Sequence, residues 1–476
     1  MTGHSDHEMQ KLSDVFLTAA EMMTERTVID EPARHLLARL DYFDGDVNAT
    51  KHRTALLRAA ANFRRIFTLN AVDAPGLVAL GAEVGPPSIT ATGVQPGSVS
   101  GTGFTFRQAF ETCVGEAVEY LSQFAMPDDA VIRLTEPAVL AETTPRMRGL
   151  WEQLGPYRRD PRAGTTAWVA AADLSDGRPV LVPADLCLRR PAGERDLDSP
   201  WPLSIGCGAG PDLLDATLHG LLELIERDAV TLWWFGGQRA RLVPSGTGST
   251  AIRRLRGDAR HRRTWLLDIT TDIGVPVVVA ASCHDDGLGL CVGHAAAPTL
   301  ERAAESAVRE MTQMELAHRI TAAKRAERGD AALNAVDRRH EWRFTELRVM
   351  DTPALHPVAP PNPPSDLLED TPGLHGNLGT PCAGLAAGGA QNQNDTQVPR
   401  ESGYDKPSLL TALRHRLAST GSSAAALNLS REQFGIPVVR AVCPGLELGM
   451  MVPPGPRLSA VAARNGVDPA NIQPLA

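Results

Sequence analysis

Residues 213–235 constrain the fold of this chain more than any other segment. Leucine, isoleucine, valine and two tryptophans cover nearly the whole circumference of the helix that this segment predicts. A helix that is apolar on all sides is buried in a protein core. The same helix nevertheless carries Glu223 and Glu226, which their spacing of three residues places on one face. The chain therefore has to bury this helix and also compensate the charge of two buried acids.

Two buried carboxylates repel each other and are costly to desolvate unless a cation compensates them. Arg227 can neutralise one, and Mg2+, which prefers carboxylate and phosphate oxygens, can neutralise several. The same spacing recurs in two further predicted helices, as Glu116 with Glu119 and as Glu310 with Gln313. For any single pair, a solvated stripe on the helix is the simpler explanation. Three pairs, one of them on an apolar helix, make a shared cation site an equally good explanation.

A loop of small residues, 204–211, opens directly into the apolar helix. Its sequence SIGCGAGP allows backbone N–H groups and a helix N-terminus to approach a phosphate. A flexible strand-to-helix turn is the more common meaning of such a loop, but loop and acid helix together indicate nucleotide and metal chemistry. Other motifs are missing from the sequence: no lysine stands in a P-loop, no Gly-x-Ser-x-Gly elbow occurs, and the thirteen histidines form no ligand-spaced cluster.

Charge and composition exclude several classes of protein. The formal net charge of −9 argues against a dedicated nucleic-acid binder, which needs clustered cations. The longest apolar run, residues 275–283, is too short for a membrane helix, and residues 1–10 lack the apolar stretch of a secretory signal. Seven cysteines without a CxxC pair fit reduced thiols better than a disulfide framework or a zinc site. We therefore predict a cytoplasmic protein that uses neither membrane nor nucleic acid.

The pattern of the 476 residues predicts an α/β fold. Helices are predicted over residues 1–72, 105–124, 213–235, 300–326 and 408–417, and strands near residues 131–134, 167–171, 180–182, 264–269 and 275–282. One echo is informative: LDIT before Gly274 and VPVV after it correspond to LNLS before Gly435 and IPVV after it. Unless two β-rich stretches coincide by chance, the echo predicts a pseudo-symmetric α/β core.

Three segments resemble the ATP-site signatures of the YcaO superfamily. Residues 204–228, with an S-x-G-x-x-A-G opening and an E-x-x-E-R-D close, resemble its central signature. Residues 100–119, with G-x-G and then G-E-A-x-E, resemble the first signature, and residues 294–313, with E-x-x-Q, resemble the third. Order and spacing match over roughly residues 80–320, and CPGLE at residues 443–447 is similar to a late family segment.

This resemblance implies an α/β (α+β) fold with a pseudo-symmetric core of mixed sheets flanked by helices. We divide the chain into a helical N-terminal extension (1–75), a YcaO-like catalytic domain (76–452) with a long loop (352–406), and an irregular tail (453–476). The resemblance also implies an enzyme that uses ATP and Mg2+ to phosphorylate a backbone amide oxygen of a ribosomally made precursor peptide. Its expected partners are that peptide and a leader-binding or TfuA-like protein, and a homodimer is one option for its assembly.

Roles follow from the resemblance position by position. It implies Mg2+ ligation by Glu116, Glu119, Glu223 and Glu226, catalytic roles for Arg227 and Glu226, and nucleotide binding by Ser204, Gly208, Ala209, Gly210, Asp215, Glu310 and Gln313. The physical chemistry agrees, because phosphoryl transfer depends mostly on positioning and charge neutralisation. Cys113 and Cys207 lie beside these residues and are assigned to packing rather than to catalysis, since free cysteine is commonly buried.

Four departures from the family pattern bear on the reaction. Thr102 and Tyr120 stand where many members carry Lys and Arg, and Asp215 replaces a common Glu. The tail lacks the Pro-x-Pro-x-Pro ending of many azoline-forming members. The N-terminal extension and residues 165–211 nevertheless resemble heterocycle-forming members, which favours cyclodehydration of Cys, Ser or Thr to an azoline. Thioamide or amidine formation with a partner, a degenerate docking scaffold, and an unrelated protein with solvated acids are the alternatives.

Overall fold

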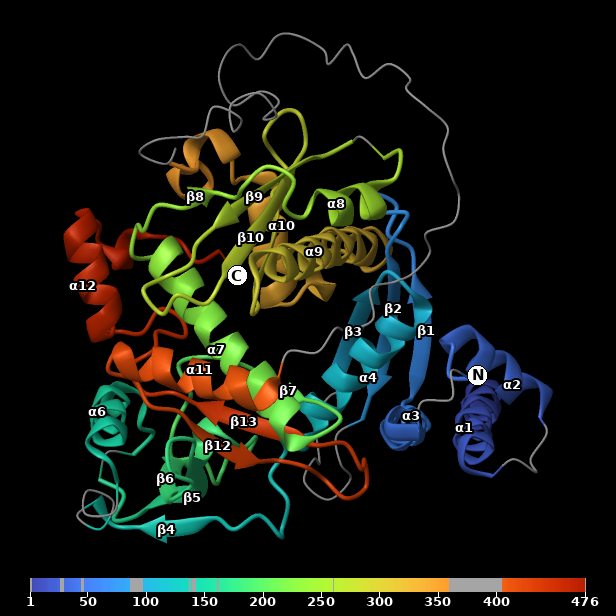
Figure 1. The fold of residues 1–476 in the computed structure, drawn as a ribbon, viewed down its shortest axis with the longest axis horizontal. Helices are drawn as coiled ribbons and strands as arrows, with labels where there is room; N and C mark the ends of the chain where they lie inside the picture. The colour runs from blue at the N-terminus through green and yellow to red at the C-terminus, as the bar shows by residue number, and fades with distance from the viewer. Residues whose placement is uncertain are drawn as a thin grey trace.

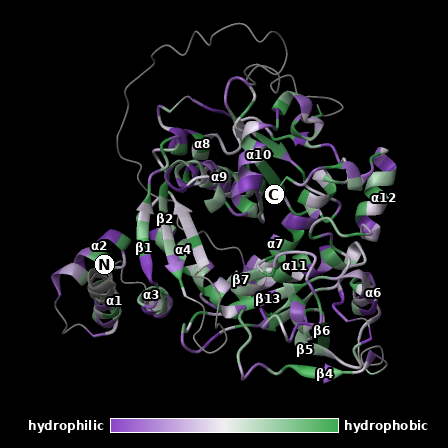
Figure 2. Ribbon diagram, turned by 180° about the vertical axis from the view of Figure 1, so that it is seen from behind, coloured by the Kyte–Doolittle hydropathy of each residue, from purple (hydrophilic) through white to green (hydrophobic). Residues whose placement is uncertain are grey.

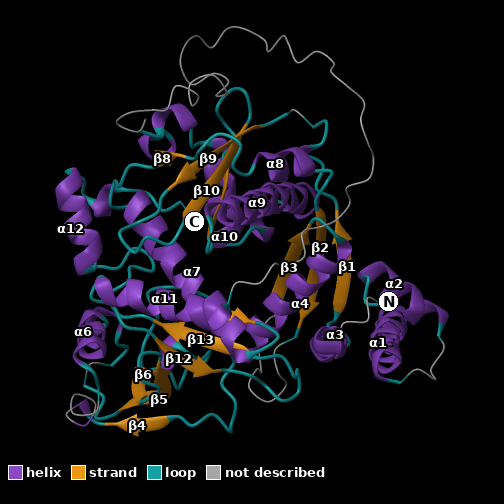
Figure 3. Cartoon of the chain, in the orientation of Figure 1, coloured by secondary structure: helices purple, strands orange, loops and turns teal. Residues whose placement is uncertain are grey.

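The computed structural model describes residues 2–475 apart from residues 26–29, 44–46, 86–96, 137, 139–142, 161, 260 and 359–404. Cys382 and most of the predicted loop over residues 352–406 therefore lie outside the described part. Within these described residues, the chain forms three antiparallel sheets with helices between and around them (Figures 1 and 3). The N-terminal helices lie together at one side of the molecule, as α1 (Thr2–Thr24), α2 (Glu31–Leu40) and α3 (Val47–Ala60).

Each sheet ends in a strand that leads directly into a long helix. The first sheet has the order β1 (Arg65–Leu69), β2 (Val78–Val84), β3 (Gly97–Gly103). The second has the order β4 (Ile132–Leu134), β5 (Thr166–Asp173), β12 (Ala425–Asn428), β13 (Val438–Val442), β7 (Cys207–Ala209), with β6 (Pro179–Pro183) paired to β5. The third has the order β11 (Cys291–Ala296), β10 (Val277–Cys283), β9 (Arg263–Asp268), β8 (Arg241–Leu242). After the edge strands β3, β7 and β11 come α4 (Phe106–Ser122), α7 (Leu213–Trp234) and α9 (Leu300–Arg328).

These three helices begin in the same way. Thr105, Asp212 and Thr299 are their N-caps, and each side chain accepts a hydrogen bond from the backbone N–H three residues further on. This bond satisfies a donor that the first turn of a helix otherwise leaves free. Because each cap lies two or three residues beyond the end of its strand, each helix packs against the sheet that it has just left.

A glycine in each edge strand allows the helix to approach the backbone closely. A Cβ atom on Gly101 would lie 2.1 Å from an amide nitrogen of α4, and one on Gly208 would lie 2.5 Å from a carbonyl oxygen of α7. A Cβ atom on Gly293 would lie 2.1 Å from an amide nitrogen of α9. These distances are far below van der Waals contact, so a side chain at any of the three positions would push the helix away from its sheet.

The helix α7 is buried, as its apolar circumference predicts. Leu221, Ile225 and Trp233 have no exposed surface, and the helix packs on β7 and β13 on one side and on β11 on the other. Strands of the same core, such as β5 and β6, are coloured as hydrophobic in Figure 2. The buried Asp228 of α7 pairs with Arg457, 3.0 Å away, which lies on α12 (Pro456–Asn465). This ion pair ties the C-terminal helix to the centre of the fold.

The structure confirms the internal echo, because β9 with β10 and β12 with β13 are both antiparallel pairs. It corrects two expectations. Residues 65–69 form β1 rather than a helix, since they pair with β2 along their whole length. The tail is not irregular throughout, because α12 begins with Pro456 and is capped at its C-terminal end by Gly466. The remaining helices are α6 (Pro145–Gln153), α8 (Ser249–Arg256), α10 (Ala335–Thr345) and α11 (Lys406–Ser419).

The described residues also bear on two predictions from composition. The six cysteines among them are buried and form no disulfide, as expected for reduced thiols. No helix in the described ranges has both the length and the apolar character needed to cross a bilayer.

Candidate functional site

A cavity of about 580 Å3 brings together side chains from α4, α7 and α9. Its polar wall consists of Ser98, Ser100, Glu116, Glu223, Glu226, Arg227, Glu310, Gln313 and His340. Its apolar wall consists of Leu69, Val99, Met314, Leu316, Ala317 and Ile320. Six side chains that the sequence predicts for one site therefore share this cavity, although they come from three different helices. Four of them are acids and only one is an arginine, so the wall carries excess negative charge.

Arg227 lies between two of these acids. Its Nη2 atom is 3.5 Å from Oε1 of Glu223 and 3.6 Å from Oε1 of Glu226. Glu223 also accepts a hydrogen bond of 2.9 Å from the backbone N–H of Gly206. One guanidinium group is thus shared by two carboxylates, which is the compensation expected for acids on a buried helix.

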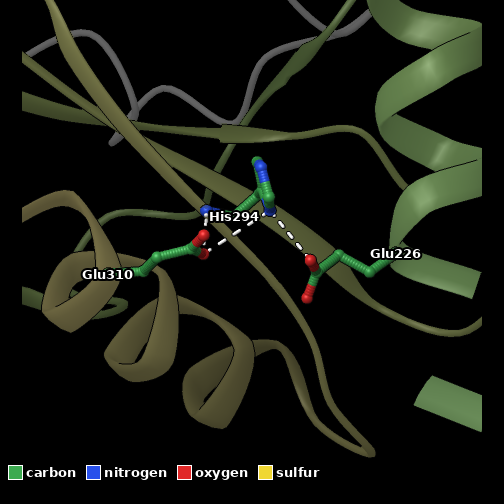
Figure 4. A group of neighbouring side chains, drawn as sticks. All are labelled: Glu226, His294 and Glu310. Carbon is green, nitrogen blue, oxygen red and sulfur yellow. Dashed lines mark hydrogen bonds and ion pairs between the residues drawn. The ribbon is translucent and has the colours of Figure 1, made fainter. Parts of the chain in front are cut away.

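His294 on β11 joins Glu226 and Glu310, which project from different helices (Figure 4). Its Nδ1 atom is 2.8 Å from Oε1 of Glu226 and 3.5 Å from Oε2 of Glu310. Its backbone N–H donates to the same Oε2 of Glu310, at 2.8 Å. Ligand atoms of the three residues all lie within 4.8 Å of one another. Histidine spacing in the sequence could not reveal this group, because it contains a single histidine that is distant from Glu226 in sequence.

An edge strand and the helix that follows it form one strand–helix unit. One side chain of each helix also contacts the strand of another unit. Glu119 of α4 accepts a 2.6 Å hydrogen bond from the backbone N–H of Ala209, which ends β7. Glu226 of α7 accepts from the backbone N–H at the end of β11, at 3.3 Å. Gln313 of α9 donates to the Ser100 hydroxyl of β3, at 2.6 Å. In each acid or amide pair, the second residue thus braces one strand–helix unit against the next.

The electrostatics of the cavity follow from burial and from the closeness of the acids. Glu116 reaches solvent through the cavity, but the surrounding protein together with Glu223 and Glu310 raises its pKa to about 7. Burial likewise raises the pKa of Glu223 and of Glu310. Burial also disfavours the charged form of Glu226, but His294 and Arg227 outweigh it and lower the pKa of Glu226. The site therefore holds acids that a bound cation would stabilise in their charged form.

Comparison with known proteins identifies the family. Residues 100–447 match the family described as YcaO cyclodehydratase, ATP- and Mg2+-binding. The chain belongs to the YcaO family. A curated relative from Rhizobium leguminosarum bv. trifolii, called an uncharacterized protein in the tfuA 3′ region, is 34% identical over 119 residues. That match covers 24% of this chain and 28% of the relative.

Solved structures share the YcaO fold at low identity. A heterocyclase in complex with substrate and cofactor is 19% identical, with a TM-score of 0.64 over 90% of this chain and 57% of that chain. The YcaO protein of Methanopyrus kandleri bound with AMPPCP and Mg2+ is 20% identical, with a TM-score of 0.55 over 83% of this chain and 89% of that one. The E. coli microcin synthetase McbBCD complex is 14% identical, with a TM-score of 0.51 over 78% and 86%. The chain thus spans little more than half the length of the first heterocyclase.

Several residues that the YcaO resemblance assigns to the nucleotide lie outside the cavity wall. Asp215 is buried and pairs with Lys406 of α11, at 2.6 Å. The backbones of Gly208 and Gly210 lie against α7, and the N–H of Gly210 donates to a carbonyl oxygen beside β13. Ser204 is exposed in the turn before β7. The structure therefore places these residues near the N-terminal end of α7 rather than in the cluster of acids.

Two positions at which the chain departs from other YcaO members have local explanations. Thr102 is buried in β3 and is only 4% exposed, which suits a short side chain. Tyr120 packs edge-on against Phe124, and the guanidinium carbon of Arg189 lies 5.1 Å from the Tyr120 ring centroid. A cation is thus present beside the position where many relatives carry Arg, although a different segment supplies it.

The two cysteines near the site are packing residues. Cys113 of α4 and Cys207 of β7 are both less than 5% exposed. Burial raises the pKa of the Cys113 thiol to about 12 and raises that of Cys207 as well. A thiol with a raised pKa carries little of the thiolate that nucleophilic chemistry needs, so the assignment to packing stands.

Proposed function

We propose that this chain uses ATP and Mg2+ to activate a backbone amide of a ribosomally made precursor peptide by phosphorylating the amide oxygen. The observation that carries the proposal is the single cavity in which Glu116, Glu223, Glu226 and Glu310 surround Arg227. Carboxylates from three helices with one arginine are what a site for Mg2+ and phosphate requires. Family membership gives the same cofactors.

The residues of the cavity fit such a cofactor pair. Carboxylate oxygens are the ligands that Mg2+ prefers, and a bound cation would offset the desolvation that raises the pKa of Glu116, Glu223 and Glu310. Glu116, Glu223, Glu226 and Glu310 would hold the metal. When bound, ATP supplies the phosphoryl group that converts the amide oxygen into a leaving group. Arg227 would hold the phosphate oxygens, and the apolar wall beside Val99 and Met314 would keep water from them.

For the product, we propose an azoline, formed when the side chain of a Cys, Ser or Thr attacks the preceding carbonyl carbon. The oxygen of that carbonyl then leaves as phosphate, so that the peptide loses one water overall. The structural likeness to heterocyclases supports the fold for this reaction. Thioamide formation is the second candidate, because the curated relative lies in a tfuA region and a TfuA-like partner is one of those that the resemblance implies.

The cofactor proposal is tested by calorimetry of AMPPCP binding, with and without Mg2+. The wild type, Glu226→Gln and a matched control, Glu305→Gln, are compared; Glu305 lies on α9 but not in the cavity wall. We expect Mg2+-dependent binding that Glu226→Gln weakens at least about tenfold, since a removed metal ligand costs no less than an outer-shell partner. Glu305→Gln is expected to match the wild type. A folded wild type that binds no nucleotide, alone or with its partner, would leave a docking scaffold as the better account.

The product is tested by mass spectrometry of a precursor peptide incubated with the chain, its partner, ATP and Mg2+. Loss of one water from the peptide indicates an azoline. Exchange of one oxygen for sulfur, in the presence of a sulfur donor, indicates a thioamide. Omitting ATP is the control, because both reactions need it.

A further inference from the structure

We propose that His294 is a positioning residue that holds the carboxylates of Glu226 and Glu310 in place for the metal and connects them to Arg227. The inference rests on the proposed function, since it concerns the same acids. It adds a residue for which neither the sequence motifs nor the family description gives a role.

The contacts of His294 reach two helices and both kinds of charge. Its side chain contacts Glu226 and Glu310 through Nδ1, at 2.8 and 3.5 Å, and its backbone N–H donates to Glu310 at 2.8 Å. On the other edge of the ring, Nε2 lies 3.4 Å from Nη1 of Arg227. Figure 4 shows both acids reaching the same side of the imidazole. One ring thus spans the arginine and two of the acids.

These contacts define which ring nitrogen carries the proton. A guanidinium group can only donate hydrogen bonds, so Nε2 facing Arg227 presents its lone pair. From these contacts we assign the proton to Nδ1, which then donates to the carboxylates. Nδ1 in this form has no lone pair for a metal ion. His294 therefore acts on the metal ligands rather than as one of them, which is how outer-shell partners orient carboxylates.

The backbone around His294 is held rigidly. The residue is 7% exposed, and a Cβ atom on the adjacent Gly293 would lie 2.1 Å from an amide nitrogen of α9. The strand is therefore fixed against the helix that carries Glu310. Glu226 comes from α7, so the two acids that His294 contacts lie on different helices. Their carboxylates would otherwise repel each other, and His294 sets the distance between them.

The experiment is a calorimetric titration of AMPPCP into full-length protein at a series of fixed free Mg2+ concentrations, from which the affinity of the complex for Mg2+ follows. Loss of an outer-shell partner costs about 10–100-fold in metal affinity, and we expect His294→Ala to weaken Mg2+ binding by that factor. His294→Asn keeps an N–H donor near the position of Nδ1 and is expected to stay within about threefold of the wild type, whereas His294→Gln displaces the donor and is expected to bind more weakly than His294→Asn.

A matched control is His284→Ala. His284 is a half-buried histidine that directly follows β10 of the same sheet, and its Nε2 atom lies 2.9 Å from Nη1 of Arg262, but it is not in the cavity wall. We expect it to leave Mg2+ affinity unchanged. The contrast between His294→Asn and His294→Gln keeps the test decisive if His294→Ala does not fold.

Pulsed electron paramagnetic resonance of the Mn2+–AMPPCP complex provides a second readout. We expect no coupling to an imidazole nitrogen, because His294 is not a metal ligand. A nitrogen coupling that disappears in His294→Asn would overturn the proposal, as would wild-type Mg2+ affinity in His294→Ala or equal affinities of the Asn and Gln variants. A wild type that binds no Mg2+–nucleotide would instead overturn the proposed function, so the two failures are distinguishable.

Discussion

Replacing Gly101 with alanine tests how the strand–helix units place the acids. A Cβ atom there would lie 2.1 Å from the amide nitrogen of Cys113 and 2.4 Å from the carbonyl oxygen of Ala109. Both atoms belong to the backbone of α4, so no side-chain rotation relieves the clash, and the helix has to retreat by about 1 Å to reach ordinary contact. Overpacking of this kind costs about 1–3 kcal/mol, and we expect the upper end because a whole helix moves.

The matched control is Gly115→Ala in the same helix. A Cβ atom at Gly115 meets nothing within 4 Å, so this change is expected to stabilise the protein by about 0.5–1 kcal/mol through helix propensity. Urea unfolding followed by tryptophan fluorescence measures both shifts. Because α4 carries Glu116 into the cavity, Gly101→Ala should also impair the reaction, since a misplacement of about 1 Å costs about 100-fold in rate. Equal stability of Gly101→Ala and wild type, or shifts of the same sign in both variants, would refute the close-packing argument.

Two further predictions concern charge. The surrounding protein together with Glu223 and Glu310 raises the pKa of Glu116 to about 7, so Mg2+ has to displace a proton below that pH. We expect the affinity of the AMPPCP complex for Mg2+ to rise about tenfold per pH unit up to pH 7 and then to level off. Calorimetry giving the same affinity at pH 6 and 8 would contradict this. Away from the site, buried Glu315 accepts hydrogen bonds of 2.7 Å from Arg256 and 3.0 Å from a second buried arginine. Glu315→Ala leaves both guanidinium groups without a carboxylate partner and should cost about 3–5 kcal/mol in urea unfolding; a loss below about 1 kcal/mol would show that water replaces the carboxylate.

The parts of the fold that could be predicted are those with a strong local signal. The apolar circumference of residues 213–235 identifies α7 as buried, and the echo around Gly274 and Gly435 identifies two antiparallel strand pairs. The helix α12 also had local signals, Pro456 at its start and Gly466 at its end, which outweigh the irregular look of the tail. By contrast, β1 follows a helical segment without a break in periodicity, and its pairing with β2 decides its structure.

The candidate site divides in the same way. Pairs at a spacing of three residues predicted which acids share a face, and the cavity contains Glu116, Glu223, Glu226 and Glu310 together. His294 could not be found from spacing, because its partners come from α7 and α9 and only the docking of β11 between them brings the three together. Likewise, no sequence pattern shows that Glu119 accepts a hydrogen bond from the backbone of Ala209. Contacts between residues of different strand–helix units can be identified only from the folded structure.

The first two strand–helix units show why the site belongs to the assembly and not to any one of its helices. Glu116 and Glu119 follow Gly101 by 15 and 18 residues, and Glu223 and Glu226 follow Gly208 by the same intervals. In both units the glycine brings the helix against its strand, and the first acid then lines the cavity while the second reaches the strand of the next unit. An isolated unit would leave its second acid without the backbone donor that the next unit supplies. The three units together therefore hold the acids this close, since the second and third units supply backbone donors to Glu119 and Glu226, and the first supplies the Ser100 hydroxyl that accepts from Gln313.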